Sequence, residues 1–426
     1  ATRGSVNEDG AAAERGRGQI TLLTLNVVGV RGYERLQAAF PPGPQLLWGP
    51  NAAGKTSLIE AIVLLSRGAS HRASSDSEIV RWGAPFARVE GWVGGTIREG
   101  DGGDRAGADS TLIEVSLERS GAGTRKRVRV NGVGRRASAL TRHLRTVLFA
   151  PEEMLLVAGA PSLRRTALDA LAGQRSPAYA ADLATYARAL AQRNSLLRAI
   201  REETAERDQL RYWDGPFLEA GSAIVAERHR LLAELAAPLA RAHAEIAPDE
   251  AAMGPLEVGY ESNAAPQAGE SARQALTRRL AETAEKEVWN GSTLVGPHRD
   301  DLVFRLGGRD LAAFASRGQQ RTAILAFKLA ELDLLRELDG RPPLLLLDDV
   351  FSELDPERRG HLVRRIAELP QAFVTTTTPA DLDPRLLEIA TAWEVVPDGG
   401  AGARLVGPSR APGGGPIDPR PGEGPG

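Results

Sequence analysis

A stretch near the start of the sequence has the residue types and spacing that a phosphate-binding loop requires. Residues 49–56 read Gly-Pro-Asn-Ala-Ala-Gly-Lys-Thr, which matches the pattern G-x-x-x-x-G-K-[ST]. In this pattern backbone N–H groups turn toward a nucleotide's phosphates, the lysine reaches the β and γ phosphate oxygens, and the threonine hydroxyl can bind Mg²⁺. The chain has only four lysines among its 53 basic residues, so a chance match is rare. We therefore predict that the chain binds a nucleotide.

The sequence around this loop predicts the elements that position it. Residues 45–48 form a short apolar run suited to a buried strand, and apolar residues recur at helical spacing from Leu58 to Leu65. The N-terminus of that helix would point at the phosphates. The predicted nucleotide contacts of this segment are Gly49, Pro50, Asn51, Ala52, Ala53, Gly54, Lys55, Thr56 and Ser57.

A second apolar run ends in two carboxylates. Four leucines, 344–347, lead directly into Asp348 and Asp349, which is the Walker B pattern of ATPases. In this pattern a buried strand delivers one carboxylate to Mg²⁺ and places a second beside the attacking water. We predict that Thr56 and Asp348 bind the metal, and that Asp349 acts as the general base or positions the water, with Lys55 as a further catalytic residue. An acidic turn after a core strand is the alternative for this segment taken alone.

Residues 315–321 resemble the signature motif of ABC-type ATPases and precede a strongly helical stretch. The hydroxyl of Ser316, the N–H of Gly318 and the helix dipole would form an anion site, beside Gln319. In the ABC family such a site meets the γ-phosphate held by the opposite subunit, so Ser316 joins the predicted catalytic residues. The alternative for Ser316 is an ordinary helix N-cap. Residues 352–355 resemble the D-loop of the same family.

Composition limits the class of protein and its cofactors. A chain of 426 residues with 42% apolar residues can build a sizeable core. No apolar run is long enough to span a bilayer and residues 1–18 lack the apolar core of a signal peptide, so we expect a cytoplasmic protein without a membrane partner. The absence of cysteine excludes disulfides and thiolate zinc sites, which leaves ATP and its Mg²⁺ as the expected cofactors. The net charge of −2 does not indicate a partner.

The order of the motifs predicts an α/β fold: an ABC-type ATPase head with a mixed and parallel sheet, interrupted by an inserted helical arm. About 260 positions separate Lys55 from Ser316, more than the compact helical insert of a transporter's ATPase subunit provides. Apolar stripes predict two long helices within the arm, and strand patterns at 86–93, 111–117 and 127–130 predict a small antiparallel sheet. The predicted boundaries are 19–160 and 260–406 for the head, 161–259 for the arm, and 1–18 and 407–426 for disordered ends.

Further stretches resemble the RecF family of bacterial recombination proteins, and with the motifs above they extend over roughly residues 20–396. They are 70–72 with 76–83, 149–153 with 163–165 and 168–169, and 296–301. The resemblance implies a head that dimerises around two ATP molecules, binds duplex DNA and gapped or single-strand junctions, and hydrolyses ATP slowly under DNA stimulation. It also implies work with RecO and RecR in loading RecA, with roles in replication and the SOS response.

Departures from the related families limit what the resemblance transfers, and one is that no Gln occupies the plausible Q-loop at 149–153. The second Walker B acid is Asp349 rather than the Glu of fast ABC ATPases, and its shorter reach suits a slow switch. Arg317 replaces the first glycine of the usual signature pair. Threonines occupy 375–378, where many ABC proteins have a γ-phosphate-sensing histidine, so that role is unassigned.

Arg31 matches an arginine that related heads place near the nucleotide; a structural arginine is the alternative.

A cluster of basic residues is the candidate DNA surface. Such a cluster binds phosphates by releasing counterions and does not read sequence. The alternative is a solvated charged face in an arginine-rich chain. The cluster consists of Arg125, Lys126, Arg127, Arg129, Arg135 and Arg136.

Three other functions compete with a RecF-like role. A P-loop transferase that phosphorylates a small molecule would leave the signature and the D-loop unexplained. The ATPase subunit of a transporter would need a membrane partner, and the stretches 70–83 and 296–301 argue against it. The ATPase subunit of another ABC or SMC-like assembly shares the motifs and stays an open alternative.

Overall fold

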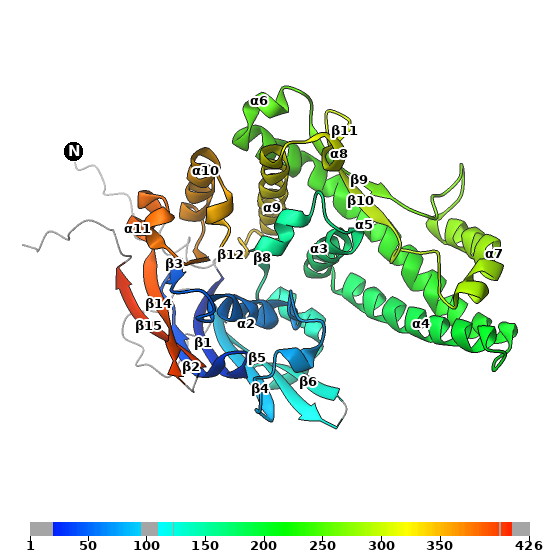
Figure 1. Cartoon of the computed structure of the whole chain (residues 1–426), viewed down its shortest axis with the longest axis horizontal. Coiled ribbons are helices and arrows are strands. Elements are labelled where there is room, and N and C mark those ends of the chain that lie inside the picture. Colours follow the sequence, from blue (N-terminus) through cyan, green and yellow to red (C-terminus); the bar gives the residue numbers. More distant parts are fainter. Residues whose placement is uncertain (1–19, 95–109, 122, 400–401, 411–426) are drawn as a thin grey trace, which may run out of the picture. The chain divides into compact units, whose positions relative to one another are not determined.

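The computed structural model describes residues 20–94, 110–121, 123–399 and 402–410, which form two compact units (Figure 1). The first unit holds the described residues of Ala1–Arg135, Leu148–Ala150 and Leu344–Gly426. The second holds Arg136–Val147 and Pro151–Pro343, and is therefore larger than the predicted arm because it also contains the signature segment. The predicted N-terminal extension lies outside the described residues.

A twelve-stranded mixed sheet forms the body of the first unit. Its strand order is β7-β6-β5-β4-β1-β2-β15-β14-β3-β13-β12-β8. The division of the chain between the two units falls inside β8, after Val147. The strands are β1 (Thr21–Val30), β2 (Tyr33–Ala39), β3 (Gly43–Trp48), β4 (Phe86–Gly94), β5 (Thr111–Ser120), β6 (Gly123–Val130), β7 (Val133–Arg135), β8 (Thr146–Phe149), β12 (Leu344–Asp348), β13 (Gln371–Thr376), β14 (Thr391–Asp398) and β15 (Gly402–Arg410).

The parallel part of this sheet explains the apolar runs in the sequence. Strands β14, β3, β13 and β12 pair in parallel, and every residue of β12 and β13 is buried. Strands covered on both faces need near-continuous apolar sequence, as in Leu344 to Leu347. The predicted strands there and at 45–48 are confirmed. The predicted small antiparallel sheet is instead the antiparallel part of the one sheet, because β4 pairs with β1.

The two longer helices of the first unit are α2, after the phosphate loop, and α10, with 13 and 12 residues. Helix α2 buries most of its side chains, as its apolar sequence requires. Strand β15 runs to Arg410, four residues into the segment expected to be a tail, and 411–426 lie outside the described residues. The helical elements are α2 (Lys55–Arg67), η1 (Asp76–Glu78), η5 (Phe351–Glu353), α10 (Pro356–Ala367), η6 (Pro379–Asp381) and α11 (Pro384–Ile389).

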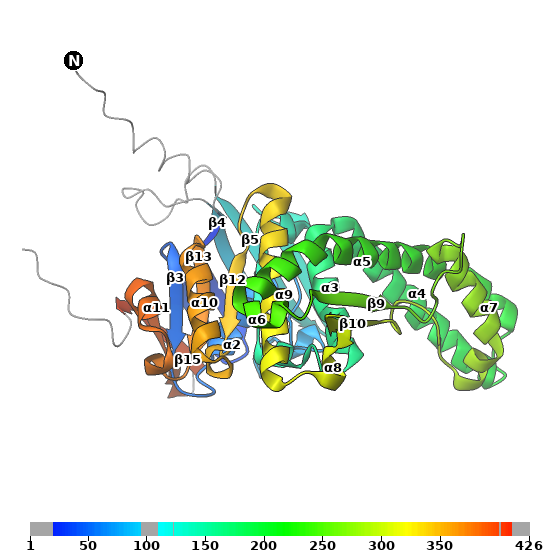
Figure 2. The same cartoon turned by 90° about the horizontal axis from the view of Figure 1, so that it is seen from above.

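The second unit is mainly helical and includes a three-stranded antiparallel sheet of order β11-β10-β9. Helices α4 and α5 are the two long helices predicted for the arm and lie side by side, with α7 packed on both (Figures 1 and 2). No helix among the described residues is long and apolar enough to cross a bilayer. The elements are η2 (Ala137–Arg142), η3 (Pro151–Leu155), α3 (Pro161–Arg175), α4 (Pro177–Arg201), η4 (Arg207–Leu210), α5 (Arg211–Ile246), α6 (Pro248–Ala251), β9 (Leu256–Glu261), α7 (Ala272–Asn290), β10 (Asp301–Leu306), β11 (Arg309–Asp310), α8 (Leu311–Phe314) and α9 (Arg317–Asp339).

A buried arginine joins several segments of this unit. Arg228 on α5 donates hydrogen bonds to Asp169 on α3, to the hydroxyl of Tyr260 on β9, and to the carbonyl of Pro297. Its side chain is only 2% exposed, so each of these contacts replaces a hydrogen bond to water that burial removes. The 296–301 stretch therefore has a structural role in holding α5 to its neighbours.

Candidate nucleotide site

The phosphate loop has the predicted strand, loop, helix order, between β3 and α2. Gly49 has φ 155° and Gly54 has φ 111°, conformations that residues with a side chain rarely adopt. A Cβ at Gly49 would lie 2.2 Å from the carbonyl oxygen of Val395, and one at Gly54 would lie 3.1 Å from the hydroxyl of Tyr33. The glycines are thus required by close packing of the loop against β14 and β2.

Lys55 lies across the loop. Its Nζ donates hydrogen bonds to the carbonyl oxygens of Gly49 (2.8 Å) and Pro50 (2.9 Å). Burial lowers the pKa of Lys55, and the nearby carboxylates of Asp349 and Asp348 act in the opposite direction. The ammonium group is therefore held between the loop and the Walker B segment, where an anionic phosphate would be favourable.

Thr56 and Asp348 converge from opposite ends of the sequence. The Thr56 hydroxyl donates to a carboxylate oxygen of Asp348 at 3.1 Å, and Asp348 is 3% exposed at the end of β12. A hydroxyl and a carboxylate oxygen at this separation are hard ligands of the kind that Mg²⁺ prefers. The two predicted metal ligands are brought together, and their donor set fits the ion.

Asp349 follows in an unusual backbone conformation, with φ 52°. Burial raises its pKa, the Lys55 charge lowers it, and the charges of Asp348 and Glu353 raise it further. A carboxylate whose pKa is moved upward is a better proton acceptor at neutral pH than an exposed one. This environment fits the predicted role of Asp349 as a general base.

Sequence reasoning left Thr375 without a role, and the structure places it between both acids. Its hydroxyl donates to Asp348 at 2.7 Å and accepts from the backbone N–H of Asp349 at 2.9 Å. The contact follows from the parallel register of β12 and β13, which sets Asp348 opposite Thr375. No local signal in the sequence could have found it, because register is a property of the folded sheet.

Arg31 lies in an ion pair with the helix that follows the phosphate loop. Two of its nitrogens donate to the two carboxylate oxygens of Glu60, each at 2.8 Å, and a third donates to the carbonyl of Glu78. Burial would raise the pKa of Glu60, but the hydrogen bonds from Arg31 and Ser70 and the charge of Arg72 lower it to about 2. The structure thus supports a structural role, and contact of Arg31 with a nucleotide stays a prediction. Sequence analysis missed Glu60. The signal that could have revealed it is an acidic residue inside the apolar stretch of this helix.

The signature segment belongs to the second unit, whereas Lys55 and both Walker B acids belong to the first. Ser316 is the N-cap of α9, and its hydroxyl accepts from the N–H of Gln319, whose side chain accepts from the N–H of Ser316. This reciprocal capping confirms the predicted helix start. Ser316 and Arg317 are exposed, and Gly318 and Gln319 are partly exposed. The start of a 23-residue helix is thus open to an anion from outside the unit.

The candidate DNA residues do not share one surface. Along β6 the side chains alternate, so exposed Arg125, Arg127 and Arg129 point to one face of the sheet. Lys126 points to the other, where it donates to the carbonyl of Gly68 (2.8 Å) and to Asp76 (3.0 Å). The prediction that Lys126 belongs to the same cluster overlooked this alternation. Arg135 ends β7, in the first unit, as an exposed residue.

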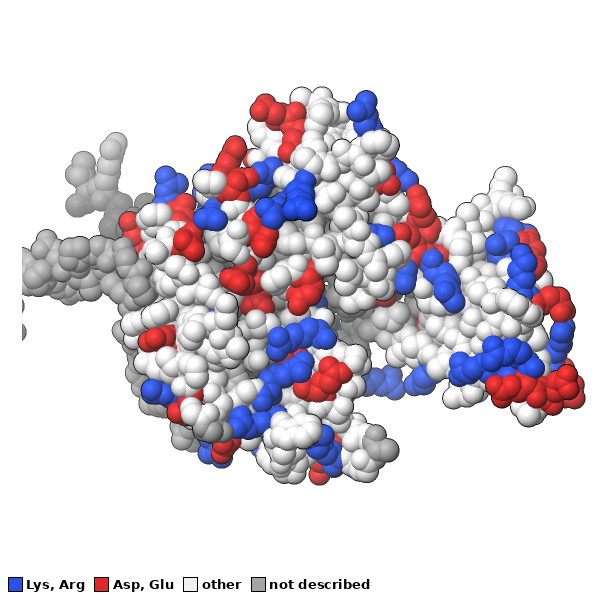
Figure 3. Space-filling model, viewed as in Figure 1, with Lys and Arg blue, Asp and Glu red and all other residues white. Residues whose placement is uncertain are grey.

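Acidic residues lie among these cations. Arg127 is 3.6 Å from Glu118 and Arg129 is 3.6 Å from Glu114, and half of each arginine side chain stays exposed. Arg136, also exposed, belongs to the second unit. On the face shown in Figure 3, Lys and Arg gather over α2 and the segment around η1, with some Asp and Glu among them. DNA contact by the β6 arginines stays a prediction.

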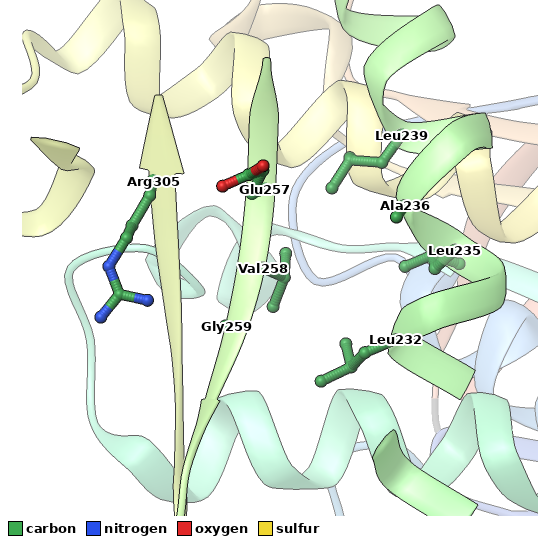
Figure 4. A pocket seen from close by; sticks show the side chains of 8 residues that line it. All are labelled: Leu232, Leu235, Ala236, Leu239, Glu257, Val258, Gly259 and Arg305. Atoms are coloured by element: carbon green, nitrogen blue, oxygen red, sulfur yellow. The ribbon is translucent and has the colours of Figure 1, made fainter. Parts of the chain in front are cut away.

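A pocket in the second unit is unlike a phosphate site. It has a volume of about 210 Å³ and lies between α5 and β9, with leucine side chains directed into it from the helix (Figure 4). The residues lining it are Leu232, Leu235, Ala236, Leu239, Glu257, Val258, Gly259 and Arg305. Its lining is mainly apolar, with Glu257 and Arg305 as the charged residues, so we assign no nucleotide to it.

Comparison with known proteins places the chain in a family. Residues 21–384 match the family model described as RecF/RecN/SMC N terminal domain. The DNA replication and repair protein RecF of Symbiobacterium thermophilum is 39% identical over 391 residues, which cover 89% of this chain and 99% of that protein. The RecF of Chloroflexus aggregans is 41% identical over 386 residues, covering 86% and 95%. The chain belongs to the RecF family.

Solved RecF structures share the fold. The recombination mediator protein RecF with ATP, in the RecFOR pathway, has a TM-score of 0.77 and 30% identity, covering 92% of this chain and 98% of that one. The structure named RecF-ATPrS has a TM-score of 0.76 and 32% identity, covering 89% and 97%. The predicted fold class is confirmed: an ABC-type ATPase head with a large mixed sheet and a helical insert, as in RecF.

Replacement of Asp349 by Asn should stabilise the protein at pH 8. The folded-state pKa of Asp349 is raised, so its ionised form costs stability above that pKa, and the cost disappears as pH falls and the carboxyl is protonated. We expect Asp349→Asn to raise Tm by about 1–3 °C at pH 8 and by less near pH 5, measured by differential scanning fluorimetry. The exposed Asp381→Asn should leave Tm unchanged. A lower Tm in Asp349→Asn at pH 8 would contradict this electrostatic assignment.

Proposed function

We propose that this chain is an ATP-dependent DNA-binding protein of recombinational repair, in which ATP joins two copies into a clamp. The proposal rests chiefly on the placement of Ser316. This residue lies at the exposed start of α9 in one unit, while Lys55, Thr56 and Asp348 cluster in the other. Each half offers part of a phosphate site, and a second copy can supply the missing part to each.

The residues of the first unit can bind and hydrolyse the nucleotide. Lys55 and the loop N–H groups bind the β and γ phosphates, and Thr56 and Asp348 would hold Mg²⁺, which when bound neutralises phosphate charge. In hydrolysis a water oxygen forms a bond to the γ-phosphorus while the bond to the β–γ bridging oxygen breaks, releasing ADP. Asp349 takes the water's proton. Its short reach suits a weak ATPase that acts as a switch and is stimulated by DNA.

Cellular role and partners follow from family membership. The relatives are named DNA replication and repair proteins, and the solved structures are named recombination mediators of the RecFOR pathway. We infer that the chain acts in the cytoplasm with RecO and RecR to load RecA at gapped DNA, and contributes to replication and the SOS response. The dimer would close on duplex DNA or at a junction when ATP binds, and it would open when ATP is hydrolysed. Hydrolysis would therefore set how long the protein stays on the DNA.

Replacement of Ser316 by Arg should prevent ATP-dependent dimerisation. The bulky cation would fill the exposed helix start, and the charge-assisted contacts it blocks are worth about 1.5–3 kcal/mol each. Light scattering with ATP and Mg²⁺ should show a dimer for wild type and a monomer for Ser316→Arg and Lys55→Met. Ser120→Arg, exposed on the β5–β6 hairpin, should dimerise as wild type does. A monomeric wild type, or a dimeric Ser316→Arg, would refute the shared site.

The β6 arginines should contribute to DNA binding, and Lys126 should not. Each phosphate contact removed reduces the slope of log K against log salt by about 0.9 for duplex DNA. We expect the double variant Arg127→Gln and Arg129→Gln to lower this slope by up to about 2, measured by fluorescence anisotropy with ATP. Lys126→Met should keep the wild-type slope, because Lys126 faces Gly68 and Asp76. An unchanged slope in the double variant would remove β6 from the DNA surface.

A further inference from the structure

The backbone of Asp349 is held in a conformation that it would rarely adopt unaided. Its φ of 52° lies in the left-handed region, which glycine enters freely and other residues enter seldom, Asn and Asp more readily than most. Such residues persist where the surrounding structure holds them, and they concentrate at functional sites. The turn after β12 therefore needs contacts that fix it.

Two hydroxyl groups supply these contacts, one on each side of the residue. The backbone N–H of Asp349 donates to the hydroxyl of Thr375 at 2.9 Å. The hydroxyl of Ser352 donates to the backbone carbonyl of Asp349 at 3.0 Å. Thr375 is fully buried, and its own proton is given to Asp348 at 2.7 Å, so this single hydroxyl is both donor and acceptor. The peptide groups before and after the Asp349 Cα are both fixed.

The carboxylate of Asp349 has no comparable support. Among the described residues nothing donates a hydrogen bond to it, although the Lys55 charge is close enough to affect its pKa. Asp348, in contrast, accepts hydrogen bonds from both Thr56 and Thr375. Since Asp349 has a short side chain with two rotatable bonds, the direction of its carboxylate depends on where the backbone places its Cα–Cβ bond.

We propose that Thr375 and Ser352 are positioning residues for ATP hydrolysis, because their hydroxyls clamp the left-handed turn that aims the Asp349 carboxylate. The proposal rests on the proposed role of Asp349 as general base. Thr375 is the stronger half of the clamp, since it is buried and water cannot replace its hydroxyl. Ser352 is exposed, and water can satisfy the Asp349 carbonyl in its absence.

The test compares variants that remove or keep the hydroxyl. Thr375→Val has nearly the shape of threonine without the hydroxyl, Thr375→Ser keeps it, and Thr376→Val is the control on the same strand. We expect kcat for ATP hydrolysis to fall about tenfold or more in Thr375→Val and about two- to threefold in Ser352→Ala. Thr375→Ser and Thr376→Val should stay within about twofold of wild type. The Kd for ATP should change by less than about threefold throughout, because Thr56 still holds Asp348.

Several results would overturn the proposal. They are an unchanged kcat in Thr375→Val, a loss that Thr375→Ser does not restore, an equal loss in Thr376→Val, or a rise in Kd as large as the fall in kcat. If Thr375→Val does not fold, Ser352→Ala tests the same turn from its exposed side, and a wild-type kcat there counts against the clamp.

A double variant separates this proposal from the function on which it rests. In an Asp349→Asn background, Thr375→Val should cause no further loss of kcat, since the group it positions is gone. A further tenfold loss would show that Thr375 acts through another residue. If Asp349→Asn alone hydrolyses ATP at the wild-type rate, the assignment of Asp349 as general base fails instead.

Discussion

Asp348 accepts hydrogen bonds from two hydroxyl groups, Thr56 on α2 and Thr375 on β13, and the geometry of the candidate site depends on this arrangement. It joins residues that lie almost three hundred positions apart in the chain. The parallel pairing of β3, β13 and β12 makes it possible, because the carboxyl ends of parallel strands meet at one edge of a sheet. Once this edge is formed, the phosphate loop, the metal ligands and Asp349 have fixed neighbours.

The charged side chains around the phosphate loop are both buried and paired with opposite charges. Lys55 is buried beside two carboxylates, which limits the cost of removing its charge from water. Glu60, fully buried on α2, is stabilised as a carboxylate by Arg31 and Arg72. Charges that are buried and paired in this way cannot move without leaving a partner uncompensated. The helix that carries Lys55 and Thr56 is therefore firmly attached to the β1–β2 turn.

Local signals in the sequence predicted the parts of this structure that local chemistry determines. The motif at residues 49–56 is recognisable from its own spacing, and the Ser316 to Gln319 capping pair joins residues three positions apart. The close packing that requires glycine at 49 and 54 comes instead from Val395 and Tyr33, which are distant in the sequence. Long-range contacts were not accessible in the same way. Thr375 depends on strand register, Arg31 depends on where the β1–β2 turn meets α2, and the partners of Lys126 are residues fifty or more positions away. The face of β6 on which Lys126 lies is different, because it follows from local alternation along the strand. Family resemblance supplied the fold class, but not these contacts.

The central claim is that each ATP is bound by residues from two copies of the chain. An experiment that mixes two variants tests this claim most directly. Lys55→Met has a damaged phosphate loop and an intact signature, and Ser316→Arg has the reverse. Each alone should remain monomeric with ATP and Mg²⁺, whereas an equal mixture should form heterodimers with one complete site, detected by light scattering and by partial recovery of ATP hydrolysis. Failure of the mixture to associate or to hydrolyse ATP above the sum of its parts would contradict a site shared between copies.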